Sequence, residues 1–324
     1  MKRFDYTVIG TAATVSVYKV KQMPTIGRSV AIENDNYDEI YHGGMAFNIC
    51  CALARLGVRI YPVLTYADAR QAEVLRDFVR RYGLPGDGIQ DPPPGSNGTT
   101  IMIQDEQKNH MTMVAGYNRR MPGSAYYAPQ IMEEGFFRDS RMAILCAPMA
   151  MNTRGILDAI RRHRIPLAFS MRRDPYAFPK DLLREILLHA QIVFSNEDEA
   201  EFICEEYGLR AVTDLFDRGN AELIATTLGA AGSVVYRKRG GAVEQMRVDI
   251  TPATAAQIDT VGAGDGYVSG FLYAYARGMD AATCARLGST LSSFVIEKDG
   301  STTNLPDADA LMARYSTRLD VKGN

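Results

Sequence analysis

The sequence predicts an α/β fold in which a doubly wound, mostly parallel sheet is flanked by helices and joined by a small β layer. From about residue 142, strand-length apolar segments alternate with helix-like ones, as parallel strands joined by helices do. Before residue 42, strand-like segments follow one another directly, which favours an antiparallel piece. With 324 residues, 46% of them apolar, the chain can bury one large core. We expect a single domain over 1–324, with the small layer drawn from about 11–42 and 97–116.

The first half of the chain is expected to hold the small layer and two helices. Gly43-Gly44 open an apolar helix that ends at Gly57, and Asp68 can cap a second helix over 69–82. A turn-rich connector at 91–98 precedes an expected hairpin. The strands expected in this half are 4–9, 15–20, 29–33, 37–41, 58–64, 99–104 and 110–115.

The second half shows the alternation that predicts the parallel sheet. The expected strands are 143–147, 166–170, 192–195, 223–227 and 233–236. Helices are expected between and after them, at 153–163, 180–189, 197–207, 264–277, 281–298 and 308–318.

Composition and missing motifs exclude several classes of function. A net charge of −2 gives no electrostatic basis for a nucleic-acid partner. The five cysteines form no C-x-x-C pair, so neither a zinc site nor a redox pair is indicated. The N-terminus lacks a signal-peptide core and no stretch is apolar for long enough to span a membrane, so a cytoplasmic protein is expected. Gly-Lys never occurs, which excludes a Walker P-loop, and H-E-x-x-H and G-x-S-x-G are absent.

The most informative stretch is Gly262-Ala263-Gly264-Asp265, which precedes an apolar, helix-like run. Small residues there let the free N–H groups of a helix N-terminus point at an anion. Asp265 competes with such an anion, unless the carboxylate accepts a proton during a reaction on it. The simpler alternative is a glycine turn with a first-turn Asp.

Two further groups of residues also have simpler explanations. Gly43 and Gly44 with Asn48 offer close backbone approach and one amide for hydroxyl recognition, or merely a helix entry. Asn196 and Glu199 follow a strand, at the edge of the sheet where open α/β folds bind ligands. Their alternative is a capping box at the start of a helix.

A last group, Thr227-Leu-Gly229-Ala-Ala-Gly232, ends the next strand and can bring backbone and a hydroxyl to a phosphate, or simply form a hairpin turn. Together, GGMAFN, NEDE, TLGAAG and DTVGAGD resemble the ribokinase-like carbohydrate and nucleoside kinases, the PfkB family, in order and spacing from about residue 5 to 315. Within that family, the segment SSFVIEKDGSTTNLP is most similar to nucleoside kinases of the adenosine-kinase and archaeal type.

The resemblance implies a phosphotransferase that moves the γ-phosphoryl of ATP to a hydroxyl of a nucleoside or ribose-like sugar. Asp265 would be the general base, and the amides of Gly262, Ala263 and Gly264 would hold the transferring phosphoryl. The resemblance further implies a β-layer lid, a homodimer formed through the lids, and a K⁺ loop at 285–300. The remaining implied sites are Mg²⁺ at Asn196 and Glu199, ATP at Thr227, Gly229 and Gly232, and the sugar at Gly43, Gly44 and Asn48.

The chain departs from the family pattern at three positions. Val15 stands where the family usually carries an Asp that grips two sugar hydroxyls, Ser170 where it usually has Asp-Pro, and Leu228 where it often has Lys. We therefore expect intact phosphoryl transfer to an altered acceptor. The alternatives are a kinase for fructose, a sugar phosphate or a sugar acid, whose anion Arg172 or Arg173 could reach, and a non-catalytic paralogue that binds a nucleotide or sugar.

Overall fold

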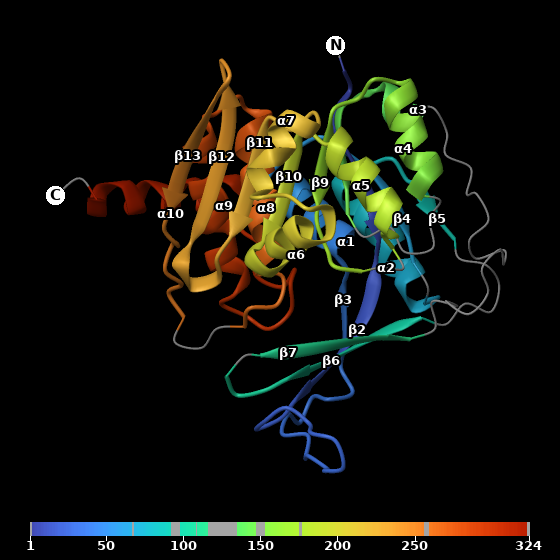
Figure 1. Cartoon of the computed structure of the whole chain (residues 1–324). Helices are drawn as coiled ribbons and strands as arrows, with labels where there is room; N and C mark the ends of the chain where they lie inside the picture. Colours follow the sequence, from blue (N-terminus) through green and yellow to red (C-terminus); the bar gives the residue numbers. More distant parts are fainter. Residues whose placement is uncertain are drawn as a thin grey trace.

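The structure is a computed structural model that describes residues 2–66, 68–91, 98–107, 109–115, 135–146, 153–174, 177–255 and 259–322. Its main body is a nine-stranded sheet in the order β13-β12-β11-β10-β9-β8-β1-β4-β5, and a separate four-stranded sheet lies beneath it (Figure 1). From β11 to β5 in this order, neighbouring strands pair in parallel. Strand β12 pairs antiparallel with both β11 and β13. The strands of the large sheet are β1 (Phe4–Thr11), β4 (Ile60–Thr65), β5 (Ile89–Gln90), β8 (Ser140–Leu145), β9 (Leu167–Ser170), β10 (Ile192–Asn196), β11 (Leu223–Thr227), β12 (Ser233–Arg239) and β13 (Ala242–Val248).

Helices cover both faces of the large sheet and build two hydrophobic cores. One core lies under α1 (Met45–Arg55), α2 (Arg70–Tyr82), α8 (Ala263–Ala276), α9 (Ala281–Val295) and α10 (Ala308–Lys322). The other lies under α3 (Gly135–Arg138), α4 (Thr153–Arg162), α5 (Lys180–His189), α6 (Glu197–Tyr207) and α7 (Leu215–Arg218). This two-faced arrangement confirms the predicted doubly wound α/β class.

The second sheet has the order β3-β2-β6-β7 and consists of β2 (Ala13–Lys19), β3 (Ile40–Gly43), β6 (Thr99–Gln104) and β7 (His110–Ala115). The strand expected at 29–33 is wrong, and of the one at 37–41 only the end is extended. Hydrogen bonds from one side chain stand in place of a strand paired with β2. The Asn34 Oδ1 accepts from the Lys19 N–H at 2.8 Å, and the Asn34 Nδ2 donates to the Val17 carbonyl at 3.1 Å. A polar side chain therefore satisfies the edge of β2 where a further strand was expected.

Other differences concern the ends of elements. Strand β13, with a largely exposed Ala242–Val248 sequence, lacks an apolar run and was not anticipated. Helix α9 ends at Val295, three residues before the expected end. Most of the connector expected at 91–98, and residue 147 of the strand expected at 143–147, lie outside the described residues. In the part of the chain that the structure describes, no helix has both the length and the apolarity to cross a bilayer.

Candidate active site

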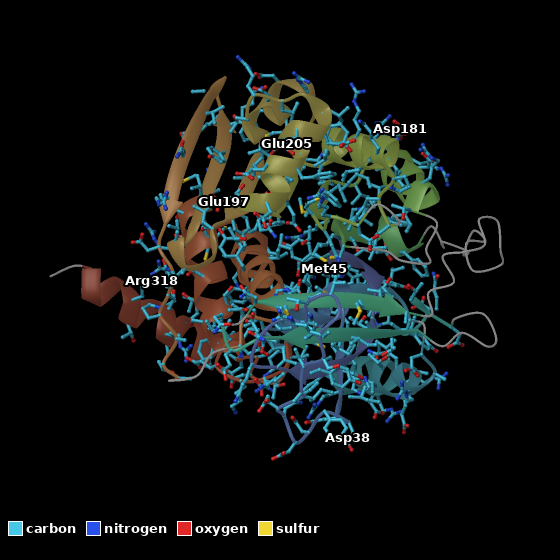
Figure 2. The ribbon with its side chains drawn as sticks, turned by 60° about the horizontal axis from the view of Figure 1, so that its bottom comes forward. Asp38, Met45, Asp181, Glu197, Glu205 and Arg318 are labelled. Atoms are coloured by element: carbon cyan, nitrogen blue, oxygen red, sulfur yellow. The ribbon has the colours of Figure 1, made fainter. Side chains whose placement is uncertain are left out.

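A cavity of about 220 Å³ lies at the carboxyl ends of neighbouring parallel strands, where open α/β sheets bind ligands. Ser170, Asn196 and Thr227 end β9, β10 and β11 and line it, and the N-terminus of α8 closes its side. Met45, which also lines the cavity, lies near the middle of the view from below (Figure 2). The cavity thus brings together Asn196, Glu199, Thr227, Gly264 and Asp265, from three of the predicted groups.

The start of α8 has the geometry that an anion site requires. Gly262 is its N-cap with φ 80°, a left-handed conformation that favours glycine, and a Cβ there would lie 2.5 Å from the Ser301 Cβ. The Ala263 N–H donates to the Thr260 carbonyl at 3.2 Å. The N–H groups of Gly264 and Asp265 have no hydrogen-bond acceptor among the described residues. Gly264 and Asp265 also line the cavity, so their amides are the donors available there. The Gly262 N–H likewise has no acceptor among the described residues, but Gly262 does not line the cavity, and the Ala263 amide is already engaged.

Asp265 is held in place by α1, which packs against α8 on the same face of the sheet. The Asn48 Nδ2 in α1 donates to the Asp265 Oδ2 at 2.7 Å. Burial raises the pKa of the Asp265 carboxyl to about 6, against the lowering effects of the Asn48 hydrogen bond and the Arg172 charge. A carboxylate with a pKa this close to neutrality is suited to accept a proton.

Asn48 itself is buried, and its other polar atom is unsatisfied. The Asn48 Oδ1 has no hydrogen-bond partner among the described residues. A Cβ built on Gly43 would lie 3.5 Å from this oxygen and 3.7 Å from the Val15 Cγ2. Gly43 therefore lies close to both Val15 and the Asn48 oxygen, and Asn48 in turn bonds the carboxylate of Asp265, although none of Gly43, Val15 and Asn48 lines the cavity. An acceptor hydroxyl placed beside Asn48 would satisfy the buried oxygen.

Gly44 serves the fold at the same place. It is the N-cap of α1 with φ 99°, and a Cβ on it would lie 2.5 Å from the Thr11 carbonyl oxygen. The two glycines thus have different roles. Gly44 lets α1 begin against β1, whereas Gly43 lies against the Asn48 side chain, where a Cβ would make an ordinary contact.

Asn196 and Glu199 form the capping box that was the simpler alternative. The Glu199 N–H donates to the Asn196 Oδ1, and the Asn196 N–H donates to the Glu199 Oε2, both at 2.8 Å. Burial nevertheless raises the pKa of the Glu199 carboxyl to about 7, although its hydrogen bond to the Asn196 backbone and the Arg172 charge lower it. A half-buried carboxylate whose pKa is raised in this way fits a cation beside it.

The described residues contain no cluster of three or more acidic, His or Cys side chains that could hold a metal ion by itself. Mg²⁺ is usually held by one or two carboxylates, water and substrate phosphates, so a single Glu at the cavity is compatible with it.

The Thr227–Gly232 segment forms the turn between β11 and β12, which confirms the hairpin alternative. The Thr227 Oγ1 donates to the Ser195 carbonyl at 3.5 Å, and Thr227 lines the cavity. Gly229 is exposed in the turn and does not line it. Gly232 packs against β13, since a Cβ on it would lie 2.2 Å from the Val248 carbonyl oxygen. Of these three residues, only Thr227 reaches the cavity.

The two arginines after β9 differ in position. Arg172 lines the cavity, and its charge lowers the pKa of both Asp265 and Glu199. No ion-pair partner for Arg172 lies among the described residues. Arg173 is exposed and lies over the Phe202 ring, with its guanidinium carbon 4.6 Å from the ring centroid. Only Arg172 can act on a molecule in the cavity.

Sequence reasoning missed the contacts that join the second sheet to this site. The Gln104 Nε2 at the end of β6 donates to the Asp259 Oδ1 at 2.9 Å, and both side chains are buried. The same oxygen accepts from the Val261 N–H at 3.1 Å. Lys19 of β2 forms an ion pair of 2.6 Å with Asp299. The partners are far apart in sequence, so no local pattern could have shown these contacts.

Comparisons with known proteins agree with this geometry. Residues 7–308 match the pfkB family of carbohydrate kinases. The chain belongs to that family. It is 24% identical over 320 residues to the nucleoside kinase of Methanothermobacter thermautotrophicus, covering 97% of this chain and 96% of that one. It is 22% identical over 290 residues to the 5-dehydro-2-deoxygluconokinase of Listeria innocua, covering 84% and 86% of the two chains.

The fold of this PfkB-family chain is also found among solved structures. The Burkholderia thailandensis nucleoside kinase, in complex with inosine, superposes with a TM-score of 0.80 at 22% identity, covering 96% of this chain and 98% of that one. At this identity the likeness shows the fold alone. Family and fold together identify the chain as a sugar or nucleoside kinase.

Proposed function

We propose that this kinase transfers the γ-phosphoryl group of ATP to a hydroxyl of a nucleoside or ribose-like sugar. The observation that carries the proposal is Asp265, which lies beside two free N–H donors, is oriented by Asn48 and has a pKa of about 6. This combination supplies a base and an anion site within one helix turn. Nearly full-length similarity to a protein named nucleoside kinase supports the choice of acceptor.

In the proposed reaction, the acceptor hydroxyl lies next to the Asn48 Oδ1 and the Asp265 carboxylate. The hydroxyl oxygen forms a bond to the γ-phosphorus, the bond from that phosphorus to the bridging oxygen breaks, and ADP leaves. Asp265 accepts the hydroxyl proton. The amides of Gly264 and Asp265 stabilise negative charge on the transferring group, so catalysis is mostly positioning and electrostatics.

The nucleotide side of the cavity would be formed by Thr227, Asn196 and Glu199. Glu199 would hold Mg²⁺, which when bound neutralises charge on the nucleotide phosphates. Arg172 lies between this side and the base, because it lines the cavity and its charge acts on both Glu199 and Asp265. We propose that Arg172 faces the transferring phosphoryl. Contacts of ATP with Gly229 and Gly232, and K⁺ binding by 285–300, stay predictions.

The second candidate acceptor is another sugar: fructose, a sugar phosphate or a sugar acid. Two observations favour it. Val15, like Asn48, lies close to Gly43, and its apolar side chain cannot accept a hydrogen bond from a hydroxyl, whereas Arg172 offers a charge that could meet an anionic acceptor. A relative named 5-dehydro-2-deoxygluconokinase also matches most of the chain.

The second sheet would close over the acceptor as a lid and exclude water. Its contacts to the site, Gln104 with Asp259 and Lys19 with Asp299, support this role. On β7 the side chains of Met111 and Met113 are 47% and 44% exposed, which supports homodimer formation through the lid. Sedimentation analysis should show a dimer that Met111→Lys together with Met113→Lys dissociates. A monomeric wild type would contradict that interface.

The function is tested by measuring ADP formation with Mg·ATP over a panel of nucleosides, sugars, sugar phosphates and sugar acids. We expect one class to give stoichiometric ADP and phosphorylated product. A nucleoside or ribose as the best acceptor supports the first candidate, and an anionic acceptor the second. If acceptors bind in calorimetry but none is phosphorylated, the chain is the non-catalytic paralogue and the proposed function is wrong.

A further inference from the structure

A second cavity, of about 770 Å³, lies away from the proposed active site, between α1, α2 and the loop at 302–305. Its apolar wall includes Phe47, Val74, Phe78 and Leu305. The rings of Phe47 and Phe78 meet edge to face with centroids 5.4 Å apart. This volume and this mostly apolar, partly aromatic lining are typical of sites for small organic molecules.

The rim of this cavity carries unbalanced positive charge. Arg55 at the end of α1 and Arg80 and Arg81 at the end of α2 all line it. Its one acidic lining residue, Asp77, pairs with Arg80 at 2.8 Å. Arg55 and Arg81 have no ion-pair partner among the described residues. A basic residue in the last turn of a helix interacts favourably with the helix dipole, which explains each arginine singly. Here two helices place such arginines around one cavity with an aromatic wall, an arrangement suited to an anion with an apolar body.

We propose that this cavity binds a small aromatic molecule that carries a phosphate group. The ring would lie against Val74, Tyr82 and Leu305, the partly exposed members of a wall whose Phe47 and Phe78 rings are buried. The phosphate would accept charge-assisted hydrogen bonds from Arg55 and Arg81. Neither part of such a ligand is explained by the proposed active site, because none of these side chains lines that cavity.

The position of the loop suggests what the ligand does. Thr302 and Thr303 line the cavity, and their neighbour Ser301 packs on Gly262 at the start of α8. Gly300, one residue earlier, lies against Tyr41 of the second sheet, since a Cβ on it would be 3.1 Å from the Tyr41 Cδ1. A ligand that shifts or stiffens this loop therefore acts on the anion site and on the lid, and regulates the kinase. This regulatory part rests on the proposed function.

Binding is tested without turnover, by equilibrium dialysis of naphthyl phosphate against the full chain in saturating ATP. The chain has no Trp, so naphthyl fluorescence can be read directly. Arg55→Gln and Arg81→Gln should each weaken binding about tenfold, as the loss of a charge-assisted bond does. Arg76→Gln, on α2 but outside the cavity, is the matched control and should change it less than about twofold. Naphthol and inorganic phosphate should each bind at least about tenfold more weakly than naphthyl phosphate.

The site is disproved if ATP displaces naphthyl phosphate completely, or if both cavity variants bind it like the wild type. Regulation is tested with the best acceptor. Naphthyl phosphate should change KM or kcat of the wild type. It should have no effect on Arg81→Gln, which we expect to have the same rate as the wild type when naphthyl phosphate is absent. Binding without any kinetic effect would contradict the regulatory part. If no acceptor is phosphorylated, the proposed function fails, while the dialysis result still decides the site.

Discussion

The two ends of the proposed active site differ in how far they keep the family's residues. At the phosphoryl end, Asp265, Glu199 and Thr227 line one cavity together with the free amide of Gly264. At the proposed acceptor end, Val15 stands where the family resemblance leads us to expect an Asp, and the buried Asn48 Oδ1 has no partner among the described residues. From this comparison we propose that transfer chemistry and acceptor choice are carried by separable parts of this fold.

The largest effect is expected when the proposed base, Asp265, is removed. Asp265→Asn should lower kcat by ~10²–10⁴, the usual contribution of a positioned base, because the amide cannot accept the hydroxyl proton. Acceptor binding measured by calorimetry should persist. Asp181→Asn makes the same change in the first turn of α5, remote from the cavity (Figure 2), and should have no effect. Turnover within about tenfold of wild type would show that Asp265 is not the base.

The second change separates the two roles of Glu199. Glu199→Gln should keep the capping box, since Gln serves at this position as well, and so leave the melting temperature unchanged. The loss of charge should lower kcat/KM for Mg·ATP by about 10–100-fold and raise the Mg²⁺ concentration needed for half-maximal rate. Glu205→Gln, exposed on the same helix, is the control. An unchanged Mg²⁺ dependence would leave Glu199 with a capping role only.

Substitutions at Gly43 and Gly44 test where the acceptor binds. Gly43→Ala places a methyl at ordinary contact distance from the Asn48 Oδ1, so it should raise KM for the acceptor about fivefold with little loss of stability. Gly44→Ala should instead lower the free energy of unfolding by about 1–3 kcal/mol or more, because φ is 99° and the Thr11 carbonyl is in the way. Acceptor titrations and thermal melts measure the two effects. A Gly43→Ala enzyme with normal KM would place the acceptor elsewhere.

The smallest expected effect is a shift in the pH dependence of the rate when Arg172 is replaced. The rate should rise with pH through about 6, since Asp265 must lose its proton to act as a base. Arg172 lowers the pKa of that carboxyl, so Arg172→Met should move the acidic limb of kcat/KM to higher pH. A structural role for Arg172 would change the melting temperature and leave the limb in place. An anion-binding role at the acceptor would raise KM for anionic acceptors only.

Most of the fold could be predicted because its signals are local. The buried strand–helix alternation after residue 142 and the Gly-Ala-Gly-Asp stretch before α8 are visible in short windows. Exposed strands such as β13 have no apolar pattern in the sequence. Near residue 34 a strand was expected, but the Asn34 side chain forms the hydrogen bond to β2 instead.

The site was predicted in outline because strand ends converge at one edge of the sheet, which placed Asn196 and Thr227 correctly at that edge. What could not be predicted depends on residues distant in sequence. The Asn48–Asp265 hydrogen bond joins positions 217 residues apart, and Gly262 is fixed by Ser301. Thr260 takes up the Ala263 amide, which depends on the backbone path before α8 and not on residue type.

The most direct test of separable ends is Val15→Asp, with kcat, KM and the acidic limb measured for ribose-type acceptors. We expect KM to fall by about tenfold or more, because the carboxylate accepts hydrogen bonds from a diol worth ~2–4 kcal/mol at full geometry. The Asp265-dependent limb should stay near pH 6. An unchanged KM for every ribose-type diol would contradict the claim that this position decides the acceptor.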